Sequence, residues 1–423
     1  MKSILIKNVK LVNPRGTGGE LDILMAEGRI VKLSPAIDAG EGMEVIDGRG
    51  LMAAPGFVDV HVHFRDPGQT HKEDIFTGAK AAAKGGVTTV VLMANTVPAV
   101  DNEETLAYVL EKGRQTGINV LSCTTVTKGM KGEELCDLEG LKAAGAAGFT
   151  DDGKPIMNEA LVREAMERAA ALGLPISFHE EDPAFIDGPG FNRGAASEHF
   201  GIGGADRQAE ISMIERDIKL ALETGAVIDI QHISTKEGVE LVRQARKKSG
   251  KIHAEATPHH FSLTEKDAIV HGVMAKMNPP LRTEEDRLAI IEGLKDGTID
   301  MIATDHAPHA AAEKAKGIKE APSGITGLET SFALGITKLV EPGYLSLETL
   351  IERMSCGPAE VYGLNTGVIR EGGPADLVLF DPDEKWIFDD HASKSSNSPF
   401  AGSELKGRVK CTVWGGKVVY SNM

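Results

Sequence analysis

One segment of the chain reads Gly56-Phe57-Val58-Asp59-Val60-His61-Val62-His63-Phe64-Arg65-Asp66-Pro67-Gly68. Its valines and phenylalanine favour extended backbone and Pro67-Gly68 ends it, which predicts a short buried strand that runs into a loop. Side chains alternate along a strand, so His61, His63 and Arg65 project from one side, about 7 Å apart per two-residue step. Two such imidazoles can hold one divalent ion, with the guanidinium facing the anion on which the ion acts. Two hydrogen-bonded core histidines are the alternative interpretation.

Downstream of this strand, short apolar runs alternate with longer helical patterns, of which the first is predicted near Thr70–Lys84. The further predicted strands are Val87–Ala94, Asn119–Thr127, Ala147–Asp152, Pro175–His179, Ala226–Ile233, Lys251–Thr257 and Asp300–Thr304. Eight apolar strands that alternate with helices predict an α/β fold, a parallel sheet closed as a (β/α)8 TIM barrel over residues 56–364. An open doubly wound sheet is the competing fold, but no Gly-x-Gly-x-x-Gly opens a first helix.

The two ends of the chain carry a different pattern. Residues 1–55 contain short strand-like runs broken by Gly, Asn and Pro. Within residues 365–423 strand-like runs return at Ala375–Phe380, Trp386–Phe388 and Val409–Tyr420. We therefore expect both ends to form one small split β domain beside the barrel. The gap Asp389–Gly407 is rich in Ser, Asn and Pro and is predicted to be a loop or extended tail, with no chemistry assigned to it.

Polar residues that interrupt apolar runs near their ends are the candidates for an active site, because barrel enzymes place theirs at the carboxyl ends of the strands. Each candidate has a structural explanation when taken alone, such as a turn aspartate or a satisfied core histidine. Their convergence at one rim makes independent structural roles improbable. The candidates are His61, His63, Arg65, Asn95, Asp151, Asp152, His179, His232, Asp305, His306 and His309.

Four histidines and two aspartates can hold two divalent ions. His61, His63 and Asp305 would bind one ion, His179 and His232 the other, and a carboxylate would bridge them. Two ions that share a hydroxide stabilise attack on a carbonyl or phosphoryl centre, and the shared hydroxide is the natural nucleophile at neutral pH. His and Asp ligands suit zinc and also Mn, Co or Fe.

Two runs give the chain a family resemblance: Asp59–Gly68, quoted above, and Ala303-Thr304-Asp305-His306-Ala307-Pro308-His309. They resemble the two signatures of the dihydroorotases, in the cyclic amidohydrolase branch of the amidohydrolase superfamily. The likeness covers nearly the whole chain, and the second signature is partly shared with allantoinases. Supporting segments are Met93–Thr96, Phe149–Gly153, Thr257–His260 and Gly324–Thr330.

The resemblance implies the ligand set given above, a pair of zinc ions and a bridging residue after the fourth strand. Related hydantoinases, allantoinases and some dihydroorotases bridge with a carboxylated lysine, whereas this chain has Asp151-Asp152, the pattern of the aspartate-bridged bacterial type. We select Asp152 as the bridge. Adjacent strand residues face opposite ways, so only one of the two aspartates should face the metals, and Asp151 is the alternative.

The implied reaction is the reversible cyclisation of N-carbamoyl-L-aspartate to L-dihydroorotate in pyrimidine (UMP) synthesis. Asp305 would act as general acid and base beside a metal-bridging hydroxide. Arg65 would bind the free carboxylate of the substrate by a two-pronged hydrogen bond. The resemblance adds further substrate-binding residues, namely Asn95, Asn278, His309, Ser323 and Gly324. Asn278 has a pre-proline turn as its plain alternative, and the charged segment His309–Glu320 is either a lid or a solvated helical turn.

Composition limits the partners. A net charge of −16 over 423 residues argues against nonspecific nucleic-acid binding and docking on anionic membranes. The four scattered cysteines indicate a reducing compartment, and neither a signal peptide nor a membrane span is evident. We expect a cytoplasmic protein that acts on a small molecule and forms a homodimer, with association with aspartate transcarbamoylase left open.

Two other functions compete with this one. An allantoinase or hydantoinase would be another cyclic amide hydrolase, and the missing bridging lysine and the run Arg65–Gly68 argue against it. A non-catalytic scaffold for aspartate transcarbamoylase is a different class of function. Every ligand position is filled here, which argues against the scaffold.

Overall fold

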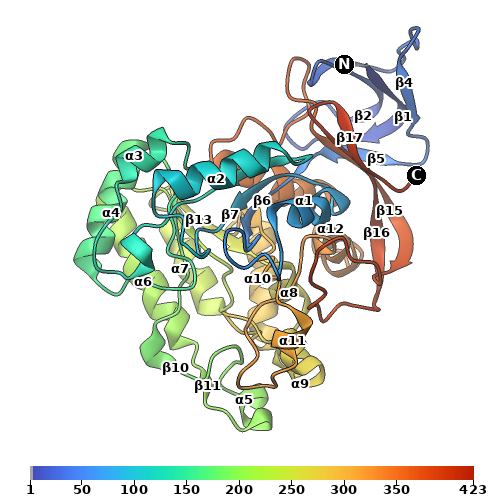
Figure 1. Cartoon of the computed structure of the whole chain (residues 1–423). Coiled ribbons are helices and arrows are strands. Elements are labelled where there is room, and N and C mark those ends of the chain that lie inside the picture. The colour runs from blue at the N-terminus through green and yellow to red at the C-terminus, as the bar shows by residue number, and fades with distance from the viewer. Residues whose placement is uncertain (1–2) are drawn as a thin grey trace.

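A computed structural model describes residues 3–423 and shows a mixed α/β fold in which both ends of the chain meet (Figure 1). One eight-stranded sheet contains strands from both ends, in the order β17-β16-β15-β5-β1-β2-β3, with β4 paired to β1. We call it the terminal sheet. Its strands are β1 (Ile4–Leu11), β2 (Gly19–Ala26), β3 (Arg29–Ser34), β4 (Glu44–Asp47), β5 (Met52–Pro55), β15 (Leu377–Ile387), β16 (Glu404–Trp414) and β17 (Lys417–Ser421).

Between the chain ends lie two parallel sheets, in the orders β6-β7-β8 and β14-β13-β12-β9. Isolated parallel bridges join Val62 to His306, Thr124 to Phe149 and Phe149 to Ile176. Nearly every residue of these strands is buried, as expected for parallel strands covered on both faces. The strands are β6 (Phe57–Val62), β7 (Val87–Leu92), β8 (Asn119–Ser122), β9 (Ile176–Phe178), β12 (Ile228–Ile230), β13 (Ile252–Ala256) and β14 (Met301–Ile302).

Helices follow most of the parallel strands and pack their apolar sides on them, as the alternating pattern predicts. The α1 helix begins where Asp74 accepts from the backbone N–H groups of Phe76 and Thr77, and α4 ends at Gly173 with φ 68°, a conformation that glycine adopts without strain. The longer helices are α1 (Ile75–Lys84), α2 (Glu103–Arg114), α4 (Glu159–Leu172), α6 (Gln208–Thr224), α7 (Lys236–Arg246) and α10 (Glu284–Asp296).

Shorter elements fill the connections. The two-stranded β10 (Ile186–Asp187) and β11 (Gly204–Ala205) lie with α5 at the lower edge of Figure 1. The short helices are α3 (Leu138–Ala143), α5 (Ala195–Phe200), α8 (Pro258–Ser262), α9 (Glu265–His271), α11 (Ala311–Lys314), α12 (Ser331–Gly335), α13 (Leu347–Ile351) and α14 (Gly357–Val361).

Several predicted boundaries are wrong for local reasons. The helix predicted from Thr70 begins at Ile75, because Asp74 caps it. Residues 147–152, predicted as a strand, form only the bridges at Phe149. The single strand predicted for Val409–Tyr420 is a hairpin that turns at Gly415 and Gly416, both at positive φ.

Two interpretations near the C-terminus also change. The runs predicted as separate strands, Ala375–Phe380 and Trp386–Phe388, belong to the single strand β15. The predicted loop Asp389–Gly407 ends earlier, because β16 begins at Glu404. Within residues 3–423, no helix combines the length and the apolar character needed to cross a membrane.

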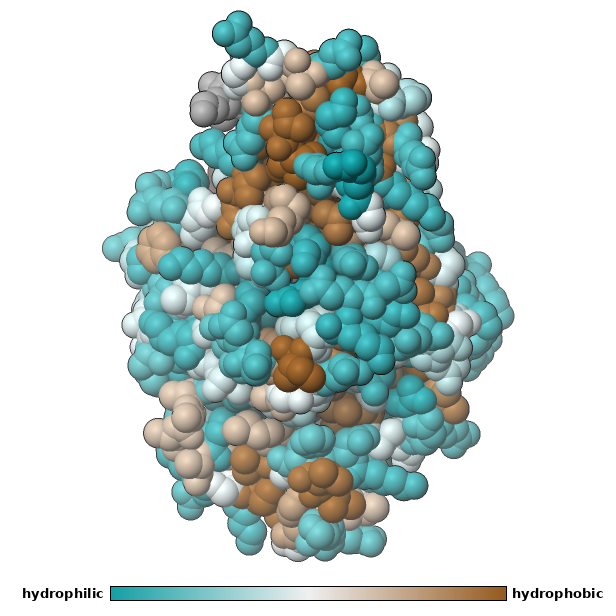
Figure 2. All heavy atoms as spheres, turned by 90° about the vertical axis from the view of Figure 1, so that its right-hand side faces the viewer, coloured by the Kyte–Doolittle hydropathy of each residue, from teal (hydrophilic) through white to brown (hydrophobic). Residues whose placement is uncertain are grey.

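One face of the molecule shows the terminal sheet above the rest of the chain (Figure 2). Hydrophilic side chains cover most of this face, and hydrophobic ones gather in its upper part. The terminal sheet has its own apolar cluster, which includes Ile6, Ile23 and Leu377, while a larger cluster fills the space between the parallel strands and their helices.

Candidate metal centre and substrate cavity

The first parallel strand, β6, presents two histidines as its period of two predicts. His61 and His63 lie on one side with ring centroids 5.4 Å apart, while Val58 and Val60, which precede them in the chain, pack into an apolar cluster. The chain then turns at Arg65, which has φ 59°. The left-handed conformation is uncommon for a residue with a side chain and points to a functional constraint.

Asp152 lies between two groups of potential ligands. Its Oδ1 is 3.6 Å from His61 Nε2, and its Oδ2 is 3.6 Å from His63 Nε2. Its Oδ1 is also 3.5 Å from His179 Nδ1 and 3.9 Å from His232 Nε2. The same carboxylate therefore completes both clusters that can hold a metal ion: His61, His63 and Asp152, and Asp152, His179 and His232.

The neighbouring Asp151 faces away from these clusters. Its carboxylate accepts hydrogen bonds from the backbone N–H of Val126 at 2.8 Å and of Thr127 at 3.1 Å, and from the Thr127 hydroxyl. Burial raises the pKa of Asp151 to about 6 despite these donors. Burial would also raise the pKa of Asp152, but the hydrogen bond from His179 and the nearby histidines hold it well below its ordinary value. The two adjacent carboxylates thus have opposite electrostatic environments.

Asp305 lies beside the pair on β6. Its Oδ1 is 2.9 Å from His63 Nε2 and 3.5 Å from His61 Nε2. Asp305 and His232 both have positive φ, 47° and 34°, as Arg65 does. Three functional candidates thus share a strained backbone conformation that aims their side chains into one space.

The spacing of these atoms fits divalent cations. The ligand atoms of a tetrahedral zinc ion, bound at about 2.0–2.1 Å, lie roughly 3.3 Å apart. The distances from Asp152 and Asp305 to the ring nitrogens of His61 and His63 scatter around that value. His61 Nε2 is buried and has no hydrogen-bond partner among the described residues, so a cation would satisfy it. The donor set, imidazoles and carboxylates, suits zinc and related metals.

In three of the four histidines, the other ring nitrogen is held by a group that the sequence analysis missed or assigned differently, while His232 Nδ1 has no partner in the described chain. His61 Nδ1 is 2.5 Å from Glu255 Oε1, and His179 Nε2 is 2.9 Å from Glu181 Oε2. Asn95, expected to contact substrate, accepts at 2.9 Å from His63 Nδ1 and donates at 2.9 Å to Asp152. Such partners fix the tautomer and orientation of a ligating histidine.

Glu255 carried a signal that sequence reasoning could have used. It interrupts the apolar run of β13, and its side chain faces the same centre as the histidines. The sequence analysis considered only residues at the ends of predicted strands, whereas Glu255 lies inside its strand. Glu181 sits two residues beyond His179 and has no pattern that separates it from the adjacent Glu180.

A cavity of about 190 Å³ opens beside the metal candidates. Every predicted substrate-binding residue lines it: Arg65, Asn95, Asn278, His309, Ser323 and Gly324. The predicted ligands His63, Asp152, His179, His232 and Asp305 line it too, whereas His61 lies behind them. The volume is below the range of about 300–1,000 Å³ typical of drug-sized ligands, which indicates a small substrate.

Arg65 is the cation of this cavity. Its side chain is half-buried, and no carboxylate among residues 3–423 lies within ion-pair distance of it. It donates from Nε to the Pro308 carbonyl at 3.3 Å. Burial lowers its pKa, but a guanidinium stays charged at neutral pH. A half-buried positive charge without an acidic partner favours an anionic ligand.

The other two residues expected at the substrate carboxylate are engaged elsewhere. Asn95 is bonded to His63 and Asp152, as described above. His309 Nε2 lies 2.8 Å from the Ser323 carbonyl, which can only accept, so Nε2 carries the proton. Burial and the nearby positive charge of Arg65 lower the pKa of His309 to about 2, so the ring is neutral. Asn278 differs, because its Oδ1 is buried without a partner in the described chain.

The segment His309–Glu320 contains the short helix α11, and most of its residues are exposed, but it is anchored at one buried side chain. Lys314 of α11 is 1% exposed, and its ammonium group donates to the carbonyls of Pro322 at 2.9 Å and Gly324 at 3.1 Å. Lys276 similarly donates to carbonyls of Ile318 and Ala321, each at 2.8 Å. Two buried lysines therefore fasten the segment to the wall of the cavity.

Comparison with known proteins finds a consistent set of relatives. A family model described as dihydro-orotase-like matches residues 50–238. Curated proteins named dihydroorotase match over the full length: one from Clostridioides difficile is 52% identical over 99% of this chain and 100% of its own. One from Clostridium acetobutylicum and one from Streptococcus thermophilus are each 50% identical, over 99% of this chain and 100% and 99% of their own.

Solved structures share the fold at lower identity. An L-hydantoinase from Arthrobacter aurescens superposes with a TM-score of 0.88 at 28% identity, over 100% of this chain and 96% of its own. A D-hydantoinase from a Thermus species has a TM-score of 0.83 at 25% identity, over 99% of this chain and 95% of its own. The mixed α/β architecture is therefore that of the cyclic amidohydrolases.

Proposed function

The chain belongs to the dihydroorotase family, and from this premise we propose that the residues gathered around Asp152 interconvert N-carbamoyl-L-aspartate and L-dihydroorotate. The family makes the chain a metal-dependent cyclic amidohydrolase of pyrimidine synthesis. The observation that carries the assignment to this cavity is the position of Asp152, which completes both ligand clusters at one wall. The opposite side of the cavity carries the unpaired charge of Arg65.

We propose zinc as the metal, with two ions per chain. His61, His63 and Asp305 would hold one, His179 and His232 the other, and Asp152 would bridge. Bound ions would supply Lewis acidity toward the amide carbonyl and lower the pKa of a water molecule. The residues supporting this proposal already lie at ligand spacing, and buried partners hold their orientations.

Asp305 is proposed as the general acid and base. Its carboxylate lines the cavity next to the ring nitrogens of His61 and His63. In ring opening it would take the proton of the attacking water and return it to the leaving nitrogen. In cyclisation it would remove the ureido proton of N-carbamoyl-L-aspartate. A positioned acid and base contributes about 10²–10⁴-fold to a rate.

Substrate orientation is assigned to the other side of the cavity. Arg65 would hold the carboxylate that the reaction leaves unchanged, by a charge-assisted hydrogen bond. The unpartnered Oδ1 of Asn278 would accept from a ring N–H, and Ser323 and Gly324 would offer backbone groups at the ring's amide edge. His309 and Asn95 would shape this surface through the bonds described above.

We also propose that the parallel strands form one closed (β/α)8 barrel over residues 56–364, with residues 1–55 and 365–423 as the split β domain. In support, the bridges through Phe149 connect β8 to β9, and the bridge from Val62 to His306 connects the chain after β14 back to β6. In the proposed barrel, Phe149 would mark the fourth strand, and the bridge from Val62 to His306 would mark the closure. A homodimer is proposed on the resemblance and a cytoplasmic location on the composition, while association with aspartate transcarbamoylase stays open.

The test is turnover by the metal-loaded chain of dihydroorotate, allantoin and hydantoin, together with metal analysis. We expect dihydroorotate to be the preferred substrate and two zinc ions per chain. A preference for allantoin or hydantoin would favour the other cyclic amide hydrolases. Absence of both metal and turnover would favour the scaffold.

A substitution tests the role of Asp305. Asp305→Asn should lower kcat about 10²–10⁴-fold, because the amide cannot carry the proton, while the circular dichroism spectrum and melting temperature stay close to those of the parent. Near-normal turnover by a folded Asp305→Asn variant would contradict the assignment.

A further inference from the structure

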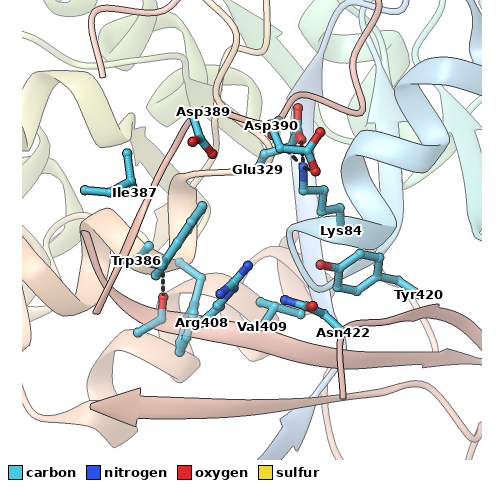
Figure 3. A pocket seen from close by; sticks show the side chains of 13 residues that line it. Lys84, Glu329, Trp386, Ile387, Asp389, Asp390, Arg408, Val409, Tyr420 and Asn422 are labelled. Atoms are coloured by element: carbon cyan, nitrogen blue, oxygen red, sulfur yellow. Dashed lines mark hydrogen bonds and ion pairs between the residues drawn. The ribbon is translucent and has the colours of Figure 1, made fainter. Parts of the chain in front are cut away.

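The segment between β15 and β16 runs from the terminal sheet to the edge of the substrate cavity. We call residues 388–403 the strap. At its beginning, Lys84 of α1 lies 3.0 Å from Asp390 Oδ2 and 3.1 Å from Glu329 Oε1. Figure 3 shows these three side chains together, next to Asp389 and Trp386. An ion-pair cluster therefore fastens the point at which the strap leaves the sheet.

Two carboxylates hold the middle of the strap. Glu329 accepts from the backbone N–H of Ala392 at 2.8 Å and of Ser393 at 3.2 Å. Glu73 is fully buried and accepts from the Ser393 hydroxyl and from the Lys394 N–H at 3.1 Å. Hydrogen bonds to buried charged groups are stronger than neutral ones, so the strap has a fixed path across this part of the molecule.

Asn397 lies near the end of the strap and is 3% exposed. Its Nδ2 donates to the carbonyl of Ala307 at 3.2 Å and to that of Gly324 at 3.0 Å. Its Oδ1 accepts from the backbone N–H of His309 at 3.0 Å, and its own carbonyl accepts from Thr326 N–H at 2.9 Å. One carboxamide thus ties the chain after Asp305 to the loop around Gly324.

Asn397 itself does not line the substrate cavity, whereas Ala307, His309 and Gly324 do. The two loops that it joins fit closely: Gly324 has φ 125°, and a Cβ built on it would lie 2.7 Å from Ala307 Cβ and 3.1 Å from His309 Nε2. A loop this close to its neighbour has little room to shift without changing the shape of the cavity wall.

We propose that Asn397 is a positioning residue for the dihydroorotase reaction, which sets the substrate-binding wall of the cavity from the strap. The inference rests on the proposed function of that wall. A carboxamide carries two N–H donors and one oxygen acceptor on one planar group. These match the two carbonyls, of Ala307 and Gly324, and the one N–H group, of His309, that Asn397 contacts. Aspartate keeps the shape but lacks the donors, and alanine lacks all three bonds.

The test compares Asn397→Ala and Asn397→Asp with Asn13→Ala in the full metal-loaded chain. Asn13, just beyond β1 of the terminal sheet, is a matched control: it is 6% exposed, and its carboxamide donates to the carbonyls of Thr17 and Ile369 and accepts from Ile369 N–H. We expect both Asn397 variants to lower kcat/KM for dihydroorotate about 100-fold, mainly through KM, because small misplacements of binding groups have effects of this size. Metal content should stay at the parent value.

The control separates positioning from stability. Asn13→Ala should lower the melting temperature about as much as Asn397→Ala, yet keep the parent KM below that temperature. An unchanged KM in the Asn397 variants, or an equal rise in KM in Asn13→Ala, would overturn the inference. If the parent chain itself did not turn over dihydroorotate, the proposed function would fail instead.

A second measurement needs no variant and covers the case in which the Asn397 variants do not fold. Hydrogen exchange of the unmodified metal-loaded chain is followed with and without saturating dihydroorotate. We expect slower exchange in a peptide that covers residues 393–400, although the strap does not line the cavity, and no change in a peptide around Asn13. Equal exchange of the strap peptide with and without dihydroorotate would overturn the inference.

Discussion

The two sides of the cavity are built in different ways. On the metal side, the ring nitrogens of His61, His63 and His179 that face away from the centre are each held by a buried partner, namely Glu255, Asn95 and Glu181. On the substrate side, Arg65 has no acidic partner and Asn278 Oδ1 has no partner among the described residues. On the first side the protein holds these three outward-facing ring nitrogens, with His232 Nδ1 as the exception, whereas the second side has polar groups that a ligand would satisfy.

This difference indicates that one side of the cavity is built to bind metal ions and the other to bind the substrate. Groups that orient metal ligands must be rigid before any substrate arrives, because a metal ion tolerates little error in ligand position. Groups that bind substrate are useful only if some of their hydrogen-bonding capacity is free. The following substitutions test whether the two sides separate in this way.

The largest effect is expected at the residue shared by both ligand clusters. Asp152→Asn should lose bound metal, measured by elemental analysis, and turnover should fall below detection, because the amide removes the negative charge that faces four histidines. Asp151→Asn is the matched control: it should keep metal and turnover but lower the melting temperature, since Asp151 accepts three hydrogen bonds from the chain. The reverse result would make Asp151 the bridging residue.

The next effect tests the substrate side. Arg65→Ala should raise KM for dihydroorotate about 100-fold, because a charge-assisted hydrogen bond is worth about 1.5–3 kcal/mol, while metal content stays unchanged. Arg65→Lys should recover part of the affinity, since lysine keeps the charge but loses the two-pronged geometry. A parent-like KM in Arg65→Ala would assign Arg65 to structure, and lost metal would place it on the metal side.

A smaller effect is expected from a partner on the metal side. Glu255→Gln should weaken zinc binding about tenfold, at the lower end of the range for such partners, because glutamine keeps an acceptor for His61 but not the charge. Competition with a zinc chelator measures this change. Glu240→Gln on the exposed side of α7 is the control. A rise in KM with unchanged zinc affinity would remove the distinction between the two sides.

The smallest effect is expected at Asn278. Asn278→Ala should raise KM about three- to fivefold, the size expected when one neutral hydrogen bond to a ligand is lost. Steady-state kinetics on dihydroorotate measures it, with Asn365→Ala beyond the last helix as the control. If KM and kcat both match the parent, the pre-proline turn is the whole role of Asn278.

The sequence was sufficient to predict the alternation of strands and helices and the residues that converge on the cavity. His61, His63, His179 and Asp305 interrupt apolar runs, and the carboxyl ends of parallel strands meet at one edge, so their convergence follows from the pattern. Alternation predicted that only one of Asp151 and Asp152 faces the metals, without deciding which, and in the structure it is Asp152 that lies between the ligand clusters.

Other features depend on contacts that local patterns do not encode. The start of α1 is set by the side chain of Asp74, which overrides the helical periodicity before it. Asn397 bonds residues that lie 73 and 90 positions away, and the composition of its segment predicts only a loop. The hydrogen bond between Asn95 and His63 depends on the orientation of the two side chains, which sequence periodicity does not predict.

The terminal sheet has a consequence for how the chain becomes an enzyme. Its strand β5 pairs with β15, and Pro55 lies opposite Leu377. When β5 leaves the ribosome, its partner strand β15 lies more than 300 residues further along the chain and has not been synthesised. Contacts between segments so distant in sequence form late. The nascent chain therefore contains the candidate metal-binding histidines long before it contains the strap. Enzymatic activity should arise only after the final strands have been synthesised.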